Sequence, residues 1–176
     1  ATANATGIQH GGNVSTDTKH IVNASAFTAA ATTVPNVLML IDLLGFYRKT
    51  SVTTTTLQVT DNTITLPRYT DGAGVQAFFV NSNATALGAG TPNLSIEYTN
   101  SAGTTGRTTP TTLPVGKTAA ANGLILYSGT GVGKYGPFVP LAAGDKGIRA
   151  VTGIQNSTSY VSGEYAVCLC RPLLTM

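Results

Sequence analysis

Two segments of the sequence combine glycine with lysine in the manner of a phosphate-binding loop. The first, residues 129–134, reads GTGVGK. A phosphate loop needs a glycine five positions before its second glycine and a Ser or Thr after its lysine, but Ser128 and Tyr135 stand there. The second, residues 116–118, has Thr111 where the first glycine would be required. Both segments are therefore predicted to be connections between strands.

Side chains that could carry acid–base, nucleophilic or metal chemistry are scattered along the chain. A carboxylate pair for glycoside hydrolysis would have to be assembled by the fold, which the sequence neither shows nor excludes. Ser128 lacks the glycine that a nucleophile elbow places two residues before it. The only histidines are His10 and His20, so a Ser-His-Asp triad, a Cys-His pair and a metal site are not expected. We predict a protein that is not an enzyme and that holds no metal and no cofactor. Among the isolated carboxylates are those of Asp42, Asp61, Asp71, Glu97, Asp145 and Glu164.

The most suggestive polar cluster is Arg68, Tyr69 and Asp71 in the segment LPRYTDG. Arg and Tyr are favoured anchors of protein interfaces, so this loop is a candidate binding site. The alternative is a loop held by a hydrogen bond from Arg68 to Asp71, with no binding role. The sequence leaves both interpretations open.

Composition limits the class of protein. Of the 176 residues, 42% are hydrophobic and 10% are charged, whereas an ordinary soluble domain carries about 25% charged residues. We therefore expect a surface of Thr, Ser, Asn and Gly, which suits a protein packed against other subunits. The net charge of +3 is spread over the chain without a run of Lys or Arg, so nucleic-acid binding is not expected.

The two cysteines, Cys168 and Cys170, are one residue apart. In a strand they would point to one face but lie too far apart for an unstrained bridge, so we predict buried thiols. The absence of a disulfide framework weakly favours a reducing compartment during folding. The chain begins at Ala1 without a basic and apolar leader, and we expect loss of an initiator Met rather than of a signal peptide.

The densest apolar run, residues 37–47, reads VLMLIDLLGFY and must belong to the core. One interpretation is a short helix that Asn36 caps and Gly45 ends. The other, which we favour, is a strand over residues 37–41 buried on both faces, followed by a helical turn that Asp42 caps over residues 43–46. A bilayer needs roughly 20 apolar residues, so no membrane association is expected.

Strand-like segments recur along the chain with turn residues between them. This spacing predicts an all-β fold, an antiparallel β-sandwich or jelly-roll-like barrel with at most one short helix. We expect one β domain over residues 34–176 and an extended N-terminal arm over residues 1–33, anchored by Ile21, Val22 and Phe27 and ordered against the body or a neighbouring subunit. The expected strands are residues 20–27, 51–60, 63–66, 75–80, 94–99, 104–112, 124–127, 147–155 and 164–171, the last ended by Pro172. Within 94–99, Leu94, Ile96 and Tyr98 alternate with polar residues. Within 147–155, we expect the side chains of Ile148, Ala150, Thr152 and Ile154 to share one face.

Three stretches resemble small virion structural proteins of tailed bacteriophages. They are DNTITLPRYTDGAGVQAFFV at 61–80, GPFVPLAAGDKGIRAV at 136–151 and VCLCRPL at 167–173. With the apolar run ending in DLLGFY and the hairpin IEYTNSAGTTGRTT at 96–109, the resemblance spans most of residues 36–173. These motifs are structural, and the resemblance implies no enzymatic residues.

We therefore expect a virion structural protein, specifically a capsid decoration or cement subunit. Its partners would be the major capsid protein and copies of itself, in a homo-oligomer on the assembled particle. It would be made in the host cytoplasm and found in the virion. The alternative is a receptor- or glycan-binding β module of a phage fibre or cell surface, using exposed side chains such as Tyr69 and Tyr135. The absence of Trp counts against sugar stacking.

Overall fold

The fold is taken from a computed structural model. It describes residues 15, 39–60, 64–82, 87–88, 90, 92–110, 124–125 and 137–175, without the side chains of 48–50 and 124–125. The predicted arm, except for Ser15, and its strand over residues 20–27 lie outside the described residues.

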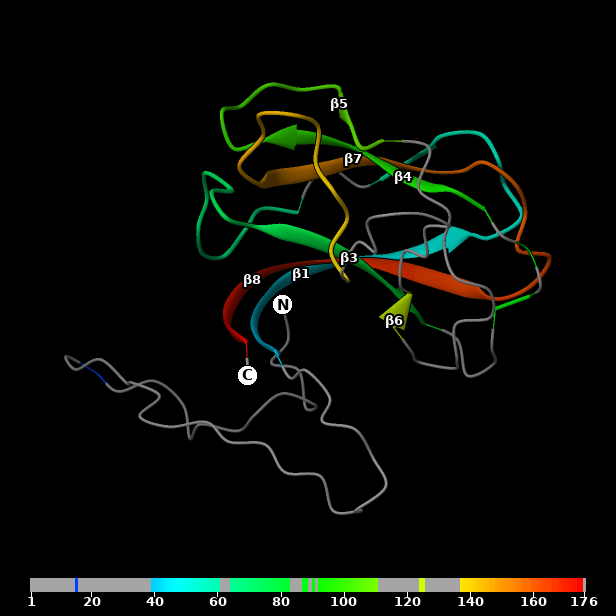
Figure 1. The fold of residues 1–176 in the computed structure, drawn as a ribbon, viewed down its shortest axis with the longest axis horizontal. Coiled ribbons are helices and arrows are strands. Elements are labelled where there is room, and N and C mark those ends of the chain that lie inside the picture. Colours follow the sequence, from blue (N-terminus) through cyan, green and yellow to red (C-terminus); the bar gives the residue numbers. More distant parts are fainter. Residues whose placement is uncertain are drawn as a thin grey trace, which may run out of the picture.

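The described residues form eight strands and no helix (Figure 1). Among them, no helix is long and apolar enough to cross a membrane. The strands are β1 (Met39–Ser51), β2 (Gln58–Val59), β3 (Gln76–Asn81), β4 (Leu94–Asn100), β5 (Arg107–Thr108), β6 (Leu124–Ile125), β7 (Ile148–Asn156) and β8 (Glu164–Thr175).

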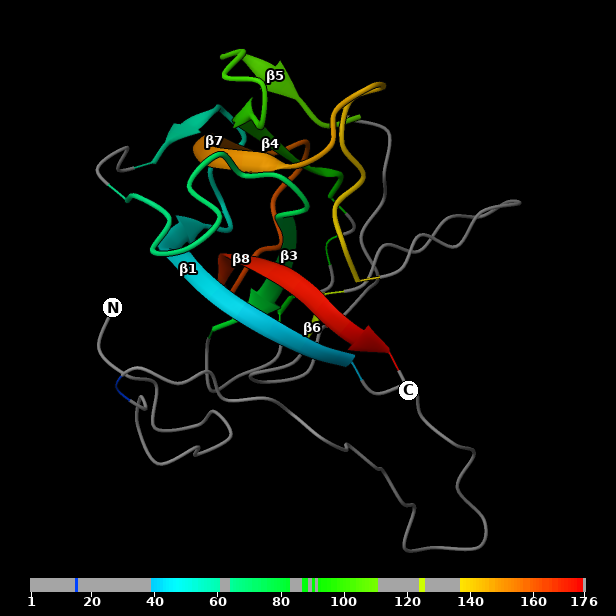
Figure 2. The ribbon, with the colours of Figure 1, turned by 90° about the vertical axis from the view of Figure 1, so that its left-hand side faces the viewer.

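The eight strands pair as one long antiparallel ribbon that is rolled up. Strand β1 pairs with β8, β2 with β7, β3 with β6 and β4 with β5. Two further pairings, β3 with β8 and β4 with β7, close the ribbon into two sheets of order β1-β8-β3-β6 and β2-β7-β4-β5. We call these sheet A and sheet B, and Figure 2 shows them facing each other. Two sheets wound in this way are a jelly roll, which confirms the predicted all-β antiparallel fold.

The main core fills the space between the two sheets. From sheet A, Phe79 meets Tyr165 edge to face with ring centroids 5.4 Å apart, and both side chains are fully buried. From sheet B, Ile96 and Tyr98 point inward, as their alternation with polar residues predicted. The remaining fully buried members include Val75, Leu94, Ile148, Val151, Val167 and Leu169.

The apolar run 37–47 is a strand throughout its described part, and both helical interpretations are wrong. Strand β1 continues from Met39 past Gly45 to Ser51. Leu43 faces Cys170 of β8 and Gly45 faces Leu169, so Leu44 is an extra residue in the ladder, a β-bulge. The bulge turns Leu44 into the core, where it is 3% exposed, while Leu43 is 39% exposed. The predicted burial on both faces concerned residues 37–41, of which the described Met39, Leu40 and Ile41 are half-buried.

The expected strands 51–60 and 63–66 contain less strand structure than predicted. Of the expected strand 51–60, only β2 and the last residue of β1 have strand structure. Between them, the Ser51 amide donates to the Gln58 side chain at 2.8 Å, and the Thr54 hydroxyl donates to the Ser51 hydroxyl at 3.0 Å. Such local side-chain hydrogen bonds compete with the backbone hydrogen bonds that would join this segment to a neighbouring strand. Residues 64–66 of the expected return strand are also irregular, although Leu66 is buried in the core.

Strand β7 has the predicted extent but not the predicted inward face. We expected Ile148, Ala150, Thr152 and Ile154 to share one face. Against β4, however, Arg149 and Thr152 are both extra residues, because Tyr98 faces Val151 and Asn100 faces Ile148. After each bulge, the side chains at every second position switch from one face of the sheet to the other. The residues that reach the core are consequently Ile148, Val151 and Ile154.

Pro172 does not end the last strand, because β8 continues to Thr175. The pairing of β8 with β3 stops at Cys170, so beyond that point β1 is the only neighbour of β8 among the described strands. A proline without an amide hydrogen is tolerated where one side of a strand is open. The strand therefore extends four residues beyond the predicted end at Arg171.

Replacing Leu44 by Ala should cost about 2 to 4 kcal/mol in the free energy of unfolding, because a buried side chain leaves a cavity. The neighbouring Leu43→Ala is the matched control and should cost clearly less than Leu44→Ala, because Leu43 lies on the outer face and not in the main core. Urea unfolding monitored by circular dichroism measures both. Equal losses would contradict the bulge at Leu44.

Candidate interface at one end of the sandwich

Three loops interlock at one end of the sandwich: residues 67–75, 101–106 and 141–147. The Gly74 amide donates to the Lys146 carbonyl at 3.0 Å, and the Ser101 amide donates to the Gly147 carbonyl at 3.0 Å. A Cβ atom on Gly147 would lie 2.1 Å from the Gly72 carbonyl oxygen, so only glycine fits there. The glycines of the sequences TDGAG and GDKG thus let two backbones touch. We call this end the loop end.

The three predicted site residues all lie at the loop end but do not bind one another as expected. Arg68 donates to the carboxylate of Asp42 through Nε at 2.7 Å and through its terminal nitrogen. Asp71 instead accepts from the Ala73 amide at 3.1 Å, an Asx turn within the loop. The hydrogen bond from Arg68 to Asp71, one of the two interpretations that the sequence left open, is therefore absent from the structure, and an ion pair ties the loop to β1 instead.

Tyr69 is fixed by a residue that sequence reasoning missed. Its backbone is left-handed, with φ of 53°, which is uncommon for a non-glycine residue. The Arg171 guanidinium stacks over the Tyr69 ring, 4.1 Å from its centroid. Such cation–π contacts hold both side chains in place. Nothing in the local sequence pairs these two residues, because they lie about one hundred positions apart.

A second polar network is centred on Asp145, whose side chain is only 5% exposed. Its Oδ2 accepts from the Tyr98 hydroxyl at 2.5 Å and from Arg107 Nε at 2.9 Å. Its Oδ1 accepts from Asn100 Nδ2 at 2.7 Å. The Tyr98 oxygen in turn accepts from the Ala142 amide at 2.9 Å. The Asp145 carboxylate therefore joins its own loop, which precedes β7, to strands β4 and β5.

Hydrogen bonds and burial in this network shift the pKa values of Asp145 and Tyr98. Hydrogen bonds from Arg107 and then Tyr98 lower the pKa of Asp145 to about 2. Burial, and then the bond to Asp145, raises the pKa of Tyr98 to about 12. Each group thus keeps one protonation state at neutral pH, which suits a structural bond and not proton transfer. The pair Gly144-Asp145 is recognisable in sequence as a turn, but the buried role of the carboxylate is not.

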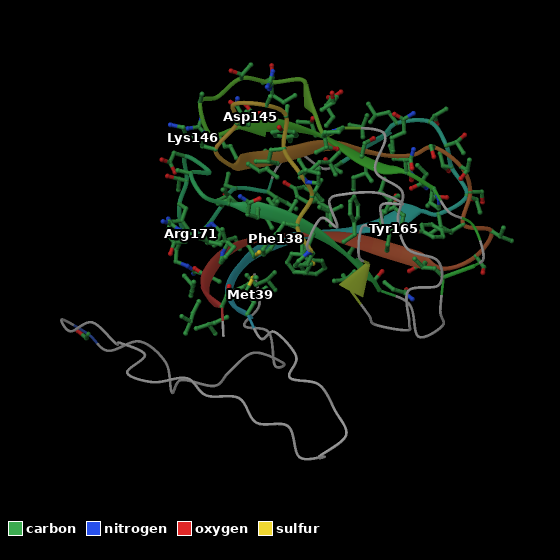
Figure 3. All side chains as sticks on the ribbon, viewed as in Figure 1. Met39, Phe138, Asp145, Lys146, Tyr165 and Arg171 are labelled. Carbon is green, nitrogen blue, oxygen red and sulfur yellow. The ribbon has the colours of Figure 1, made fainter. Side chains whose placement is uncertain are left out.

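All five basic side chains that the structure describes lie at the loop end. Figure 3 shows Lys146 next to Asp145, and Arg171 on the same side of the sandwich at the level of sheet A. Within the described part of the chain, two of the five form ion pairs, Arg68 with Asp42 and Arg107 with Asp145. Lys146, Arg149 and Arg171 form no ion pair there. The carboxylate of Asp71, which also forms no ion pair among the described residues, offsets one of these charges, so this end keeps a net positive charge. The described carboxylates of Glu97 and Glu164 lie elsewhere, in β4 and at the start of β8.

The remaining candidate groups do not gather into a site. The two glycine-lysine segments, Ser128, His10 and His20 lie outside the described residues. Within the described residues, no three His, Cys, Asp or Glu side chains are grouped as metal ligands. Cys168 and Cys170 are free and buried, and burial raises their pKa values to about 11 and about 12. Thiols of such high pKa are poor nucleophiles.

The Arg68–Asp42 pair should contribute modestly to stability, because the Arg68 side chain is 55% exposed. A double-mutant cycle with Arg68→Ala and Asp42→Asn should give a coupling of about 0.5 to 1 kcal/mol that shrinks in high salt. Urea unfolding in low and high salt measures it. A coupling well above this range would mean that the pair, and not the interlocked backbone, holds the loop.

The Asp145 network should make stability depend on pH. Because the pKa of Asp145 falls from 3.8 to about 2 on folding, its contribution is present above about pH 4 and is lost as the pH falls through about 2. Urea unfolding from pH 7 to pH 2 should show Asp145→Asn less stable than the parent at pH 7, with the gap narrowing below pH 4. Asp71→Asn, at an exposed carboxylate, is the control. A gap that does not change with pH would contradict this role.

Comparison with known proteins adds no relative. No protein-family model matches the chain, no curated protein matches it, and no solved structure matches it.

Proposed function

We propose that this chain is a virion structural protein, a capsid decoration or cement subunit. The observation that carries the proposal is the strand order, β1-β8-β3-β6 and β2-β7-β4-β5, of an eight-stranded jelly roll. Viral capsid domains are among the proteins built on this fold. Because a fold hosts several functions, this support is an analogy. It agrees with the bacteriophage resemblance of residues 61–80, 136–151 and 167–173.

The subunit acts by adding contact area to a shell. In this proposal its partners are the major capsid protein and further copies of itself, and it resides in the virion after synthesis in the host cytoplasm. A modest interface suffices, because each copy adds contacts between shell subunits and many copies act together. The role needs no catalysis, no nucleic acid and no membrane. It requires a rigid body with a defined docking surface.

The loop end has the properties of such a docking surface. Its backbone is held by the interlocked Gly72 and Gly147, so little order is lost on binding. Tyr69 and Arg68 are positioned in advance by Arg171 and Asp42. The positive charge left on this end favours an acidic surface on the shell protein and steers the encounter.

The alternative, a receptor- or glycan-binding module, gains no support from the site. One face of the Tyr69 ring is already covered by Arg171, which reduces the surface available for a sugar. Tyr135 lies outside the described residues. Lectin domains also use jelly rolls, so the strand order does not separate the two functions. We therefore propose only the role of a virion structural protein.

Purified virus particles from the system that encodes this chain should contain it in a fixed ratio to the major shell protein. Quantitative mass spectrometry of intact particles measures the ratio, and cryo-electron microscopy should locate an eight-stranded sandwich on the shell. Particles without any peptide of this chain would rule the proposal out.

The docking surface is tested in the same particles. Lys146→Glu combined with Arg149→Glu should lower occupancy at least several-fold, because the charge of the loop end is reversed. Thr65→Glu combined with Thr158→Glu is the control, since it places the same two Glu side chains at other exposed sites. Equal losses for both pairs would mean that the loop end does not dock.

A further inference from the structure

The central strands of the two sheets differ in the polarity of their outer faces. The outward residues of β4 in sheet B are polar, and Glu97 accepts a hydrogen bond from the Thr152 hydroxyl at 3.0 Å. On sheet A, the outward Phe78, Cys168 and Cys170 form a second apolar cluster, and all three are buried. The solvent face of an antiparallel sheet is normally polar. The outer face of sheet A is therefore built to be covered.

Part of this face is already covered by the chain itself. Phe138 forms an isolated antiparallel bridge with Phe78, and the two rings meet edge to face at 6.4 Å. On the β1 side the cover is incomplete, because Leu43, which lies opposite Cys170, is 39% exposed. What remains is a strip along β1 formed by the outward side chains of Met39, Ile41, Leu43 and Phe46, which we call the β1 strip.

We propose that residues 20–28 of the same chain occupy the β1 strip in the free subunit. This proposal does not rest on the virion role. The segment contains Ile21, Val22 and Phe27, the bulky apolar residues that the sequence identifies as anchors of the N-terminal arm. It has no Lys, Arg, Asp or Glu, so an apolar strip can cover it without burying a full charge.

The size of the β1 strip favours a single extended segment over a globular partner. At about 3.3 Å per residue, the distance from Met39 to Phe46 is about 23 Å, and a strip one strand wide, about 4.8 Å, offers on the order of 100 Å². A stable interface between two folded proteins buries about 800 Å² on each partner. A second copy packed on this strip alone would fall well short of that area.

The position of the chain favours its own N-terminal segment. Residues 1–38 precede Met39, the first residue of β1. Figure 3 shows Met39 and Phe138 on the side of sheet A that faces away from sheet B. The 12 steps from Phe27 to Met39 can span up to about 40 Å, which is enough to return over the strip. A tether of this length also gives a high effective concentration.

Photo-crosslinking in the full chain tests this placement. With p-benzoylphenylalanine in place of Phe27, irradiation of dilute protein should link position 27 within one chain to tryptic peptide 150–176, which holds Cys168 and Cys170, or to peptide 135–146, which holds Phe138. Mass spectrometry of the monomer band identifies the product. The same probe in place of Thr6 is the control and should not give these links. No link, links only between chains, or equal links from both positions would each overturn the proposal.

A second pair of variants separates packing on the strip from chance proximity. Leu43→Ser should reduce the crosslink from position 27 several-fold, because it makes the strip polar. Leu57→Ser removes a leucine of similar exposure, 42%, that packs on Gly153 of sheet B, and it should leave the yield unchanged. Circular dichroism of both variants ensures that the body is folded. If Leu43→Ser leaves the yield unchanged in a folded protein, the segment does not lie on the β1 strip.

Discussion

Burial of both faces of β8 is the constraint on which the rest of the structure depends. Every side chain from Tyr165 to Cys170 is buried, with Tyr165, Val167 and Leu169 in the main core and Cys168 and Cys170 in the outer cluster. A strand can be buried in this way only at the centre of a sheet, so β8 must lie between β1 and β3. First and last strands therefore meet, and the ribbon between them has to roll up. The jelly roll is the consequence.

Most of the charged side chains that the structure describes lie at the loop end of the rolled ribbon. Charges inside such a fold are stable only when paired, and the nearly buried Asp145 satisfies this with donors from Tyr98, Asn100 and Arg107. The exposed pair of Arg68 and Asp42 joins the next loop to β1. What is left over is a rigid end with unpaired positive charge. A binding surface of this kind is recognised through shape and charge, which is why we connect it with assembly.

Much of the fold could be predicted from the sequence, and the errors share one cause. The strand over residues 75–80, the alternation of Leu94, Ile96 and Tyr98 and the turn before β5 follow from local patterns and are present in the structure. The helical turn after Asp42, the inward face of β7 and the stop at Pro172 were wrong. In each case a bulge or the end of a neighbouring strand decided the outcome, and both depend on the pairing partner. The predicted site residues lie together, but their partners Asp42 and Arg171 come from distant strands.

By itself, the sequence determined the class of fold, the low charge of the surface and the turns at which loops form. These properties follow from residue types and short spacings, because β-branched and apolar runs favour strands and glycine permits the turns. The tertiary structure alone decided which strands are neighbours, where the bulges fall and which charges are neutralised. Such features arise from contacts between residues as far apart as Tyr47 and Val151, whose hydroxyl and amide meet at 3.2 Å. No local pattern encodes them, because the free energy that selects them comes from packing the whole ribbon at once.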